Sequence, residues 1–282
     1  MELQEFRLLF NKELSALYPK TEIDAFFFRL MKHFMDYEVM DIFLKPSTPI
    51  STDTMVLLQK ALTSLLNEEP LQYILGSTEF YRFPFVVNKD VLIPRPETEE
   101  LVDWILKDIE NKKEQVTILD IGCGSGCIPI SLKKHLDEAL VFALDVSDKA
   151  IEVAKLNAIE NKVDVTFLQK DILKTEKLDM KFDVITSNPP YVRELEKKEI
   201  QNNVLQNEPH LALFVSDEDP LIFYAAIANL ALQHLTEKGV LYFEINQYLG
   251  IETKEMLVQK GFKNVILKKD LFGKDRMIKA FL

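Results

Sequence analysis

The stretch that decides the fold is VTILDIGCGSGCIPISL, residues 116–132. It opens with an apolar run typical of a buried strand, passes through three glycines and ends in a helical pattern. The chain has only 8 glycines, so Gly122, Gly124 and Gly126 within five residues mark a special turn. Glycine permits sharp turns and a close approach of the backbone to a ligand. A strand, a glycine turn and a helix in this order predict a nucleotide-type binding loop in an α/β sheet.

Strand-like and helix-like segments alternate along the rest of this region. The strand-like segments are VTILDIG, VFALD, DVTFL, FDVITSN, GVLYFEI, NVILKK and RMIKAFL. Helical patterns separate most of them. Such alternation predicts a largely parallel sheet with helices on both faces, which binds its ligand at the carboxyl ends of the strands.

The sequence before residue 96 predicts two smaller parts. Through residues 1–76, apolar residues recur at helical spacing, with proline-containing breaks such as KPSTPIST. Residues 77–95 partly alternate between apolar and polar, which predicts a short β-hairpin. We therefore expect a helical domain over residues 1–76, a hairpin linker over 77–95 and an α/β domain over 96–282.

The amino-acid composition limits the classes of molecule that the protein is expected to bind. The formal net charge is -11, from 45 acidic and 34 basic residues. This balance argues against direct nucleic-acid binding, which needs clustered Lys and Arg, and favours a small ligand or a basic protein surface. The two cysteines, Cys123 and Cys127, lack the spacing of a zinc site, so no metal is expected. Without a signal-peptide pattern or an apolar run of roughly 18 residues, we expect no membrane association and a cytoplasmic setting.

The glycine spacing separates two classes of cofactor. The loop reads G-x-G-x-G, whereas the dinucleotide pattern G-x-G-x-x-G would need glycine where Cys127 stands, which disfavours a dehydrogenase. Asp145 ends the next strand-like segment, where an acidic side chain accepts the ribose hydroxyls; the alternative is that it only caps a helix. Asp171, in FLQKDIL, is placed to meet the adenine amino group. Together these residues favour S-adenosylmethionine.

A second motif, Asn188-Pro189-Pro190-Tyr191, follows the apolar segment FDVITS. These residues also suit an ordinary turn with a packed tyrosine. However, the turn falls at the same edge of the sheet as the glycine loop, where a substrate must lie. The Asn188 side-chain oxygen and the Pro189 carbonyl can accept both N–H groups of a planar amide, while Tyr191 stacks on it. Prolines stiffen the loop, so we assign catalysis to Asn188, Pro189 and Tyr191 and substrate binding to Asn188–Tyr191.

These motifs resemble those of the release factor glutamine N5-methyltransferases, the PrmC or HemK type. The resemblance extends over the whole chain and rests on PLQYILGSTEFYRFPF, LIPRPETEELV, DIGCGSGCIPISL, Asn-Pro-Pro-Tyr and DLFGKDRMIKAFL, in family order. It implies a Rossmann-like, seven-stranded methyltransferase domain with a small N-terminal all-helical domain joined by a β-hairpin. It also implies N5-methylation of the Gly-Gly-Gln glutamine in class 1 peptide chain release factors, which the helical domain helps to dock.

The resemblance also implies a set of S-adenosylmethionine-binding residues. They are Gly122, Cys123, Gly124, Ser125, Gly126, Asp145, Asp171, Ile172 and Asn188. Three positions depart from the family pattern. FVSDEDPL replaces a glycine-rich turn, Ile172 stands where an aromatic residue is common, and Asn246 stands where glycine is common.

Two other functions are compatible with parts of this pattern. Asn-Pro-Pro-Tyr is shared with adenine N6-methyltransferases that act on DNA or RNA, although the acidic composition counts against that class. The second alternative is a catalytically silent module that binds a partner through its helices. It is disfavoured because such a module need not retain the glycine loop, Asp145 and the Asn-Pro-Pro-Tyr motif together.

Overall fold

The computed structural model describes residues 1–110 and 115–282. The described chain forms two compact units. The first comprises Met1–Gly76 with Asn202–Asn207, and the second comprises Ser77–Gln201 with Glu208–Leu282. Residues 202–207, which the sequence places in the α/β domain, thus group with the N-terminal helices.

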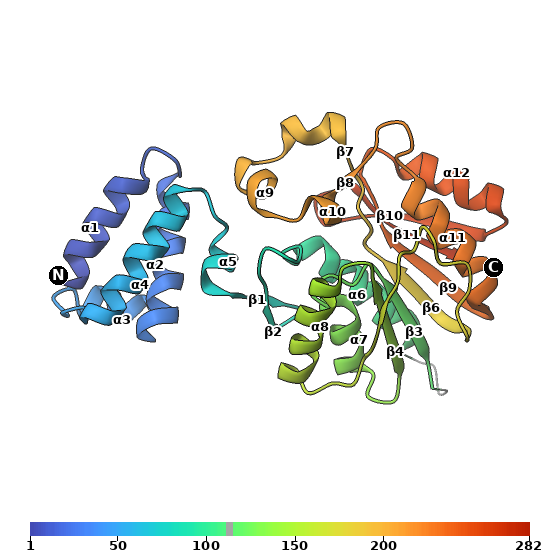
Figure 1. Ribbon diagram of the computed structural model, residues 1–282, viewed down its shortest axis with the longest axis horizontal. Helices are drawn as coiled ribbons and strands as arrows, with labels where there is room; N and C mark the ends of the chain where they lie inside the picture. The colour runs from blue at the N-terminus through green and yellow to red at the C-terminus, as the bar shows by residue number, and fades with distance from the viewer. Residues whose placement is uncertain (111–114) are drawn as a thin grey trace. The chain divides into compact units, whose positions relative to one another are not determined.

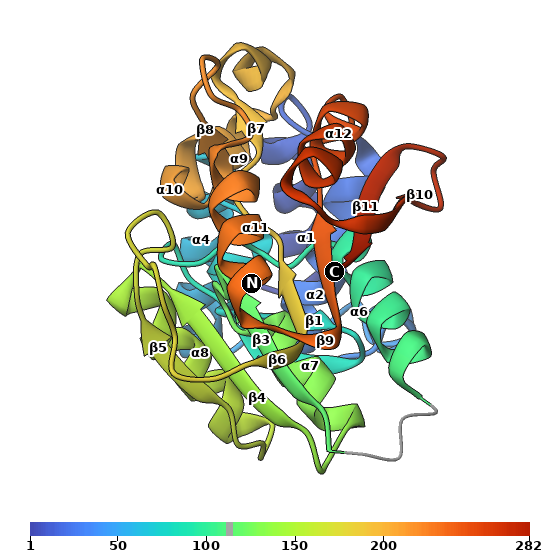
Figure 2. The ribbon, with the colours of Figure 1, turned by 90° about the vertical axis from the view of Figure 1, so that its right-hand side faces the viewer.

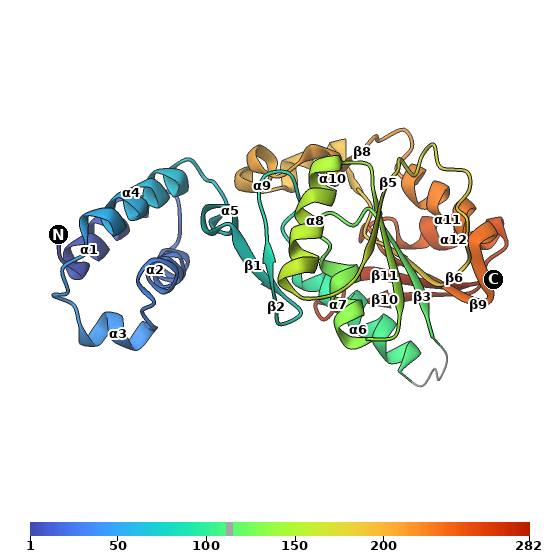
Figure 3. The ribbon, with the colours of Figure 1, turned by 60° about the horizontal axis from the view of Figure 1, so that its bottom comes forward.

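The first unit is helical (Figure 3). Its helices are α1 (Leu3–Leu14), α2 (Lys20–Met35), α3 (Val39–Leu44), α4 (Thr52–Leu66), α5 (Leu71–Leu75) and α9 (Asn202–Asn207). The apolar residues that predict the helices before residue 77 meet in one core, where the rings of Phe6, Phe10 and Phe27 are fully buried and in mutual contact. The Asn207 side chain donates to the Glu68 carbonyl at 3.2 Å, which holds α9 to this unit.

The second unit begins with a β-hairpin, β1 (Ser77–Phe80) paired with β2 (Phe83–Val86). Its two-residue turn places Tyr81 and Arg82 at φ 49° and 66°, the left-handed conformation that a tight hairpin requires. Asn157 exchanges two hydrogen bonds with the Val86 backbone, at 2.6 and 2.9 Å. The hairpin is therefore anchored to the helix that carries Asn157.

The seven-stranded sheet of the second unit confirms the predicted α/β class (Figure 2). Its strands are β3 (Thr117–Ile121), β4 (Leu140–Asp145), β5 (Thr166–Gln169), β6 (Phe182–Ser187), β9 (Leu235–Glu244), β10 (Lys263–Lys269) and β11 (Asp275–Phe281). The spatial order is β10-β11-β9-β6-β3-β4-β5. The strands from β9 to β5 in that order run parallel, whereas β11 pairs antiparallel with both β9 and β10.

Helices cover both faces of the sheet (Figure 1). One apolar core packs it against α6 (Pro96–Ile109), α7 (Cys127–His135) and α8 (Asp148–Glu160). The other packs it against α11 (Ile222–His234) and α12 (Gly250–Lys260). Successive residues of β3, Ile118 and Leu119, enter opposite cores, as expected of a strand that is buried on both faces.

A long excursion follows β6 before the chain reaches α11. It contains β7 (Val192–Arg193), the 3-10 helix η1 (Glu194–Glu199), α9, α10 (His210–Leu213) and β8 (Phe214–Val215). β7 and β8 pair in parallel, so the two ends of the excursion return to each other. Within the described ranges, no helix is both long and apolar enough to cross a membrane.

Candidate active site

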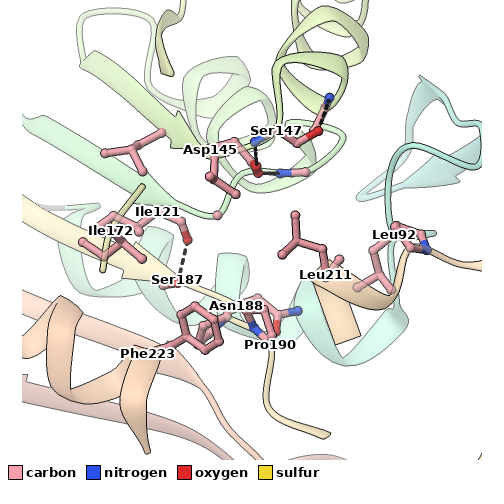
Figure 4. Close-up of a pocket in the computed structure, with 18 of the residues that line it drawn as sticks. Leu92, Ile121, Asp145, Ser147, Ile172, Ser187, Asn188, Pro190, Leu211 and Phe223 are labelled. Carbon is pink, nitrogen blue, oxygen red and sulfur yellow. Dashed lines mark hydrogen bonds between the residues drawn. The ribbon is translucent and has the colours of Figure 1, made fainter. Parts of the chain in front are cut away.

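A pocket opens in the second unit at the carboxyl ends of β3, β4 and β6 (Figure 4). It contains about 890 Å³ of space, part of it open to solvent. Gly122 and Asp145 lie on its lining together with Asn188, although these three residues belong to different segments of the sequence. Residues from three separate motifs therefore border one cavity.

The glycine loop leaves the β3 strand in a conformation that favours glycine. Gly122, Gly124 and Gly126 have φ of 75°, 52° and 80°. A Cβ placed on Gly122 or Gly124 meets no described atom within 4 Å, and both residues line the pocket. The backbone thus borders open space at these two positions, as a close-lying ligand would require.

Asp145 joins the glycine loop to the start of α8. Its Oδ2 accepts the Gly124 N–H and its Oδ1 accepts the Ser147 N–H, each at 2.9 Å. Burial raises the pKa of this carboxyl, while backbone hydrogen bonds, those from Ser147 and Gly124 among them, lower it. A carboxylate has about four lone-pair sites, so two remain for ligand hydroxyls. Ser147 caps α8, as its hydroxyl accepts the Ala150 N–H at 3.2 Å. The helix-cap role considered for Asp145 thus belongs to Ser147.

Three predicted cofactor residues belong to the glycine loop but do not line the pocket. Cys123 and Ser125 are buried, and Gly126 packs against α8. Asn157, which the sequence analysis did not identify, donates to the Ser125 carbonyl at 2.9 Å and so links the loop to the β-hairpin. The sequence held no signal for it, because the burial of this polar side chain is seen only in the structure.

Both cysteines are held as thiols. Burial raises the pKa of Cys123 well above its usual range, and it raises that of Cys127 to about 12. No group of three or more potential metal ligands occurs among the described residues. The positions of the cysteines fit small packing residues in a crowded turn.

Another part of the cavity combines apolar side chains with one carboxylate. Asp171 and Ile172, both predicted, line it, and so does the ring of Phe223. Figure 4 places Phe223 on the same side of the pocket as Asn188 and Pro190. Lys174 lowers the pKa of Asp171 through a 3.0 Å ion pair, so this carboxylate stays charged. Phe223 was missed because it belongs to α11, more than 30 residues after the Asn-Pro-Pro-Tyr motif.

Asn188 leaves β6 and has its side chain held by α6. Its Nδ2 donates to the Thr98 hydroxyl at 3.3 Å, and Asn188, Pro189 and Pro190 all line the pocket. Tyr191 does not line it. The Tyr191 ring packs against the core below α11, and its hydroxyl donates to the Glu244 carboxylate at 3.0 Å. Stacking of Tyr191 on a substrate amide stays a prediction.

Glu244 is the last residue of β9 and is 1% exposed. Burial raises its pKa, while hydrogen bonds from Thr98 and Tyr191 and the charge of Arg276 lower it. Asn246, which departs from the family pattern, donates to the Tyr191 carbonyl and to Glu196, both at 2.8 Å. The side chain at position 246 therefore fixes the backbone that follows the two prolines.

A buried carboxylate connects two loops that line the pocket. Glu208, 3% exposed, accepts the Ile93 N–H at 3.2 Å and pairs with Arg95 at 2.5 Å. Leu92 and Leu211, which flank these residues in sequence, both line the cavity (Figure 4). RPETEELV and NEPHLAL thus meet at the pocket, a contact between segments more than 100 residues apart.

Asp120 lies under the glycine loop without exposure to solvent. Neither of its carboxylate oxygens has a hydrogen-bond partner among the described residues. Burial raises the pKa of Asp120 well above its usual range, and the charge of Asp145 raises it further. A buried acceptor without a partner beside open glycine backbone fits a cofactor that carries hydrogen-bond donors or positive charge.

Comparisons with known proteins agree with this architecture. The Methyltransferase small domain model matches residues 101–213, and the PrmC N-terminal domain model matches residues 10–76. In solved structures, a methyltransferase from Pyrococcus furiosus aligns with TM-score 0.53 and 16% identity over 82% of this chain and 98% of its own, which supports the fold.

Two curated relatives share far more of the sequence. The release factor glutamine methyltransferase of Flavobacterium psychrophilum is 52% identical over 99% of both chains. That of Bacteroides thetaiotaomicron is 42% identical over 96% of both. With the cavity, the glycine loop and the Asn-Pro-Pro-Tyr turn placed as described, this chain belongs to the release factor glutamine methyltransferase family.

Proposed function

We propose that this enzyme transfers a methyl group from S-adenosylmethionine to the side-chain nitrogen N5 of the Gly-Gly-Gln glutamine in class 1 release factors. The observation that carries the proposal is a single cavity bordered by Gly122, Asp145 and Asn188. One part of this cavity suits a nucleoside, and another part presents hydrogen-bonding groups to a planar amide. The relatives' names indicate the same substrate.

The cofactor fits the residues of the cavity. Asp145 has free lone pairs for the ribose hydroxyls, and Asp171 with Ile172 borders the space proposed for adenine. Gly122 and Gly124 leave room for the chain that carries the sulfonium, and the buried carboxyl of Asp120 offers oxygens that have no partner among the described residues. We assign Cys123, Ser125 and Gly126 to shaping this loop. When bound, S-adenosylmethionine supplies an electrophilic methyl group.

The amide nitrogen of glutamine is a poor nucleophile because its lone pair is delocalised. The Asn188 side-chain oxygen and the Pro189 carbonyl accept its two N–H groups, which orients the nitrogen and stabilises the positive charge that develops on it. Pro189 and Pro190 restrict the backbone, so these acceptors need little rearrangement. Rate enhancement then comes mainly from positioning, and the methylated nitrogen releases its extra proton afterwards.

The helical unit is proposed to dock the protein substrate. It carries the part of the chain that matches the PrmC N-terminal domain model. Its α3 helix leaves the apolar side chains of Met40, Phe43 and Leu44 exposed at 67%, 57% and 71%. Neighbouring exposed apolar side chains of this kind are typical of a surface that binds another protein. Because release factors act on ribosomes, the proposal places the reaction in the cytoplasm.

The test is transfer of labelled methyl from S-adenosylmethionine to a purified class 1 release factor. A release factor with alanine in place of the Gly-Gly-Gln glutamine is run beside it. We expect label on the wild-type factor alone, loss of that label with Asn188→Ala, and retention with Asn229→Ala, an exposed asparagine on α11. Label on DNA or RNA instead would favour an adenine methyltransferase, and no label on any substrate would favour a silent binding module.

A further inference from the structure

Thr98 stands between Asn188 and a buried carboxylate. It belongs to the first turn of α6 and is 2% exposed. Its hydroxyl donates to Glu244 Oε2 at 2.6 Å and accepts from Asn188 Nδ2 at 3.3 Å. Thr98 of α6, Glu244 of β9 and Asn188, which follows β6, thus form one chain of hydrogen bonds that ends at the pocket.

The direction of this chain follows from counting protons. A threonine hydroxyl has one proton, and the short contact to Glu244 uses it. Tyr191 also donates to Glu244, at 3.0 Å, so this carboxyl accepts from two hydroxyls. The remaining lone pairs of Thr98 can only accept. Asn188 must therefore turn its NH2 group toward Thr98.

This arrangement determines which end of the Asn188 amide is left for a ligand. With NH2 directed at Thr98, the other branch of the side chain is the oxygen Oδ1, an acceptor. A flipped Asn188 would present NH2 to the substrate amide, and two donors would then face each other. The two orientations of an asparagine amide have almost the same shape, so packing alone discriminates poorly between them.

We propose that Thr98 and Glu244 are positioning residues that fix the amide orientation of Asn188, so that its oxygen faces the glutamine nitrogen. This inference rests on the proposed function, and it adds RPETEELV to the substrate side of the site. Neither Thr98 nor Glu244 lines the pocket, and so both act through Asn188.

The kinetic test compares Thr98→Val, which keeps the shape but removes the hydroxyl, with Thr98→Ser, which keeps the hydroxyl. Losing one correctly oriented acceptor should lower kcat roughly 10- to 100-fold in Thr98→Val. The Kd for S-adenosylhomocysteine should stay within about twofold, since Asp145 and the glycine loop are untouched. Thr98→Ser should restore most of kcat. A Thr98→Val enzyme with wild-type kcat would overturn the inference.

A matched control separates positioning from loss of a buried hydroxyl. Thr253 is fully buried and donates to the Leu249 carbonyl at 2.7 Å within α12. Thr253→Val should lower thermal stability to a similar extent as Thr98→Val while leaving kcat near wild type. An equal fall of kcat in both variants would show that Thr98 has only a structural role.

A second measurement does not depend on the release factor. In protein labelled with 15N-asparagine, the two side-chain N–H signals of Asn188, assigned by their loss in Asn188→Ala, report its hydrogen bond. We expect slow exchange with solvent in wild type and Thr98→Ser, and exchange at least several-fold faster in Thr98→Val. Equal exchange in all three would refute the arrangement. If the wild type transfers no methyl to a release factor but shows this protection, the proposed function alone fails.

Discussion

Replacing Gly126 with alanine should destabilise the second unit, whereas the same change at Gly122 should mainly weaken cofactor binding. Both glycines are in the left-handed region, at φ 80° and 75°, so alanine costs about 1–2 kcal/mol of backbone strain at either position. At Gly126 the new Cβ would also lie 2.9 Å from Ile130 Cδ1 and 3.1 Å from Ala154 Cβ. Both neighbours are fully buried, so relief requires α7 or α8 to shift.

Overpacking of this kind costs about 1–3 kcal/mol, which gives a total of about 2–5 kcal/mol for Gly126→Ala. At Gly122 the Cβ meets no described atom within 4 Å and enters the cavity instead. The expected loss of stability there is the strain alone, about 1–2 kcal/mol, together with weaker binding of S-adenosylhomocysteine.

Urea denaturation measures the two free energies of unfolding. Trp104 is the one tryptophan of the chain and lies on α6, so its fluorescence reports the second unit. Isothermal titration calorimetry with S-adenosylhomocysteine gives the cofactor affinity of each variant. Equal losses of stability in the two variants, or a larger loss at Gly122, would refute the packing argument.

Three further predictions concern buried carboxylates. Asp145→Asn leaves one side-chain oxygen for two backbone donors and removes the negative charge. The affinity for S-adenosylhomocysteine, measured by calorimetry, should therefore fall roughly 10- to 100-fold. Unchanged affinity would exclude a contact between Asp145 and the ribose. The pKa of Asp120 is raised in the folded protein, so folding favours its protonated form. The resulting contribution to the free energy of unfolding is complete below the unfolded pKa of about 4. It is lost as the pH rises through the raised folded pKa. Thermal melts should show Asp120→Asn gaining stability relative to wild type as pH rises, and a pH-independent difference would contradict this. Arg95→Met leaves the Glu208 carboxylate buried without its cation. Because Arg95 is one-third exposed, we expect the free energy of unfolding in urea to fall by about 1–3 kcal/mol. Adding Glu208→Gln should recover part of this loss, and additive losses in the double variant would argue against the ion pair.

Much of the fold and part of the cavity follow from the sequence because their signals are local. Most strands of the sheet contain a short apolar run, and the glycine turn directly follows β3. Asp145 and Asn188 stand at strand ends, and the carboxyl ends of parallel strands meet at one edge. Their convergence was therefore predictable without coordinates.

The residues that hold these groups in place were not predictable in the same way. Thr98 meets Glu244 across 146 positions of sequence, and Asn157 meets Val86 across 71. No periodic pattern reports such pairs, because each partner alone resembles an ordinary polar residue of a helix or strand. Asn246 was noticed only as a departure from the family pattern, and its contacts with Tyr191 and Glu196 explain it.

The two cysteines in the glycine turn have a practical consequence. Alkylating reagents attack the thiolate, and the raised pKa of Cys127, about 12, leaves little thiolate at pH 7. Cys123 is buried and is protected further by its own raised pKa. A single cysteine introduced at an exposed position outside the proposed docking surface, such as Leu8 in the helical unit or Leu271 at the β10–β11 turn, would thus react in preference with a maleimide dye. With a dye at both positions, fluorescence energy transfer would follow the distance between the two units as a release factor binds, in a protein that retains its native thiols.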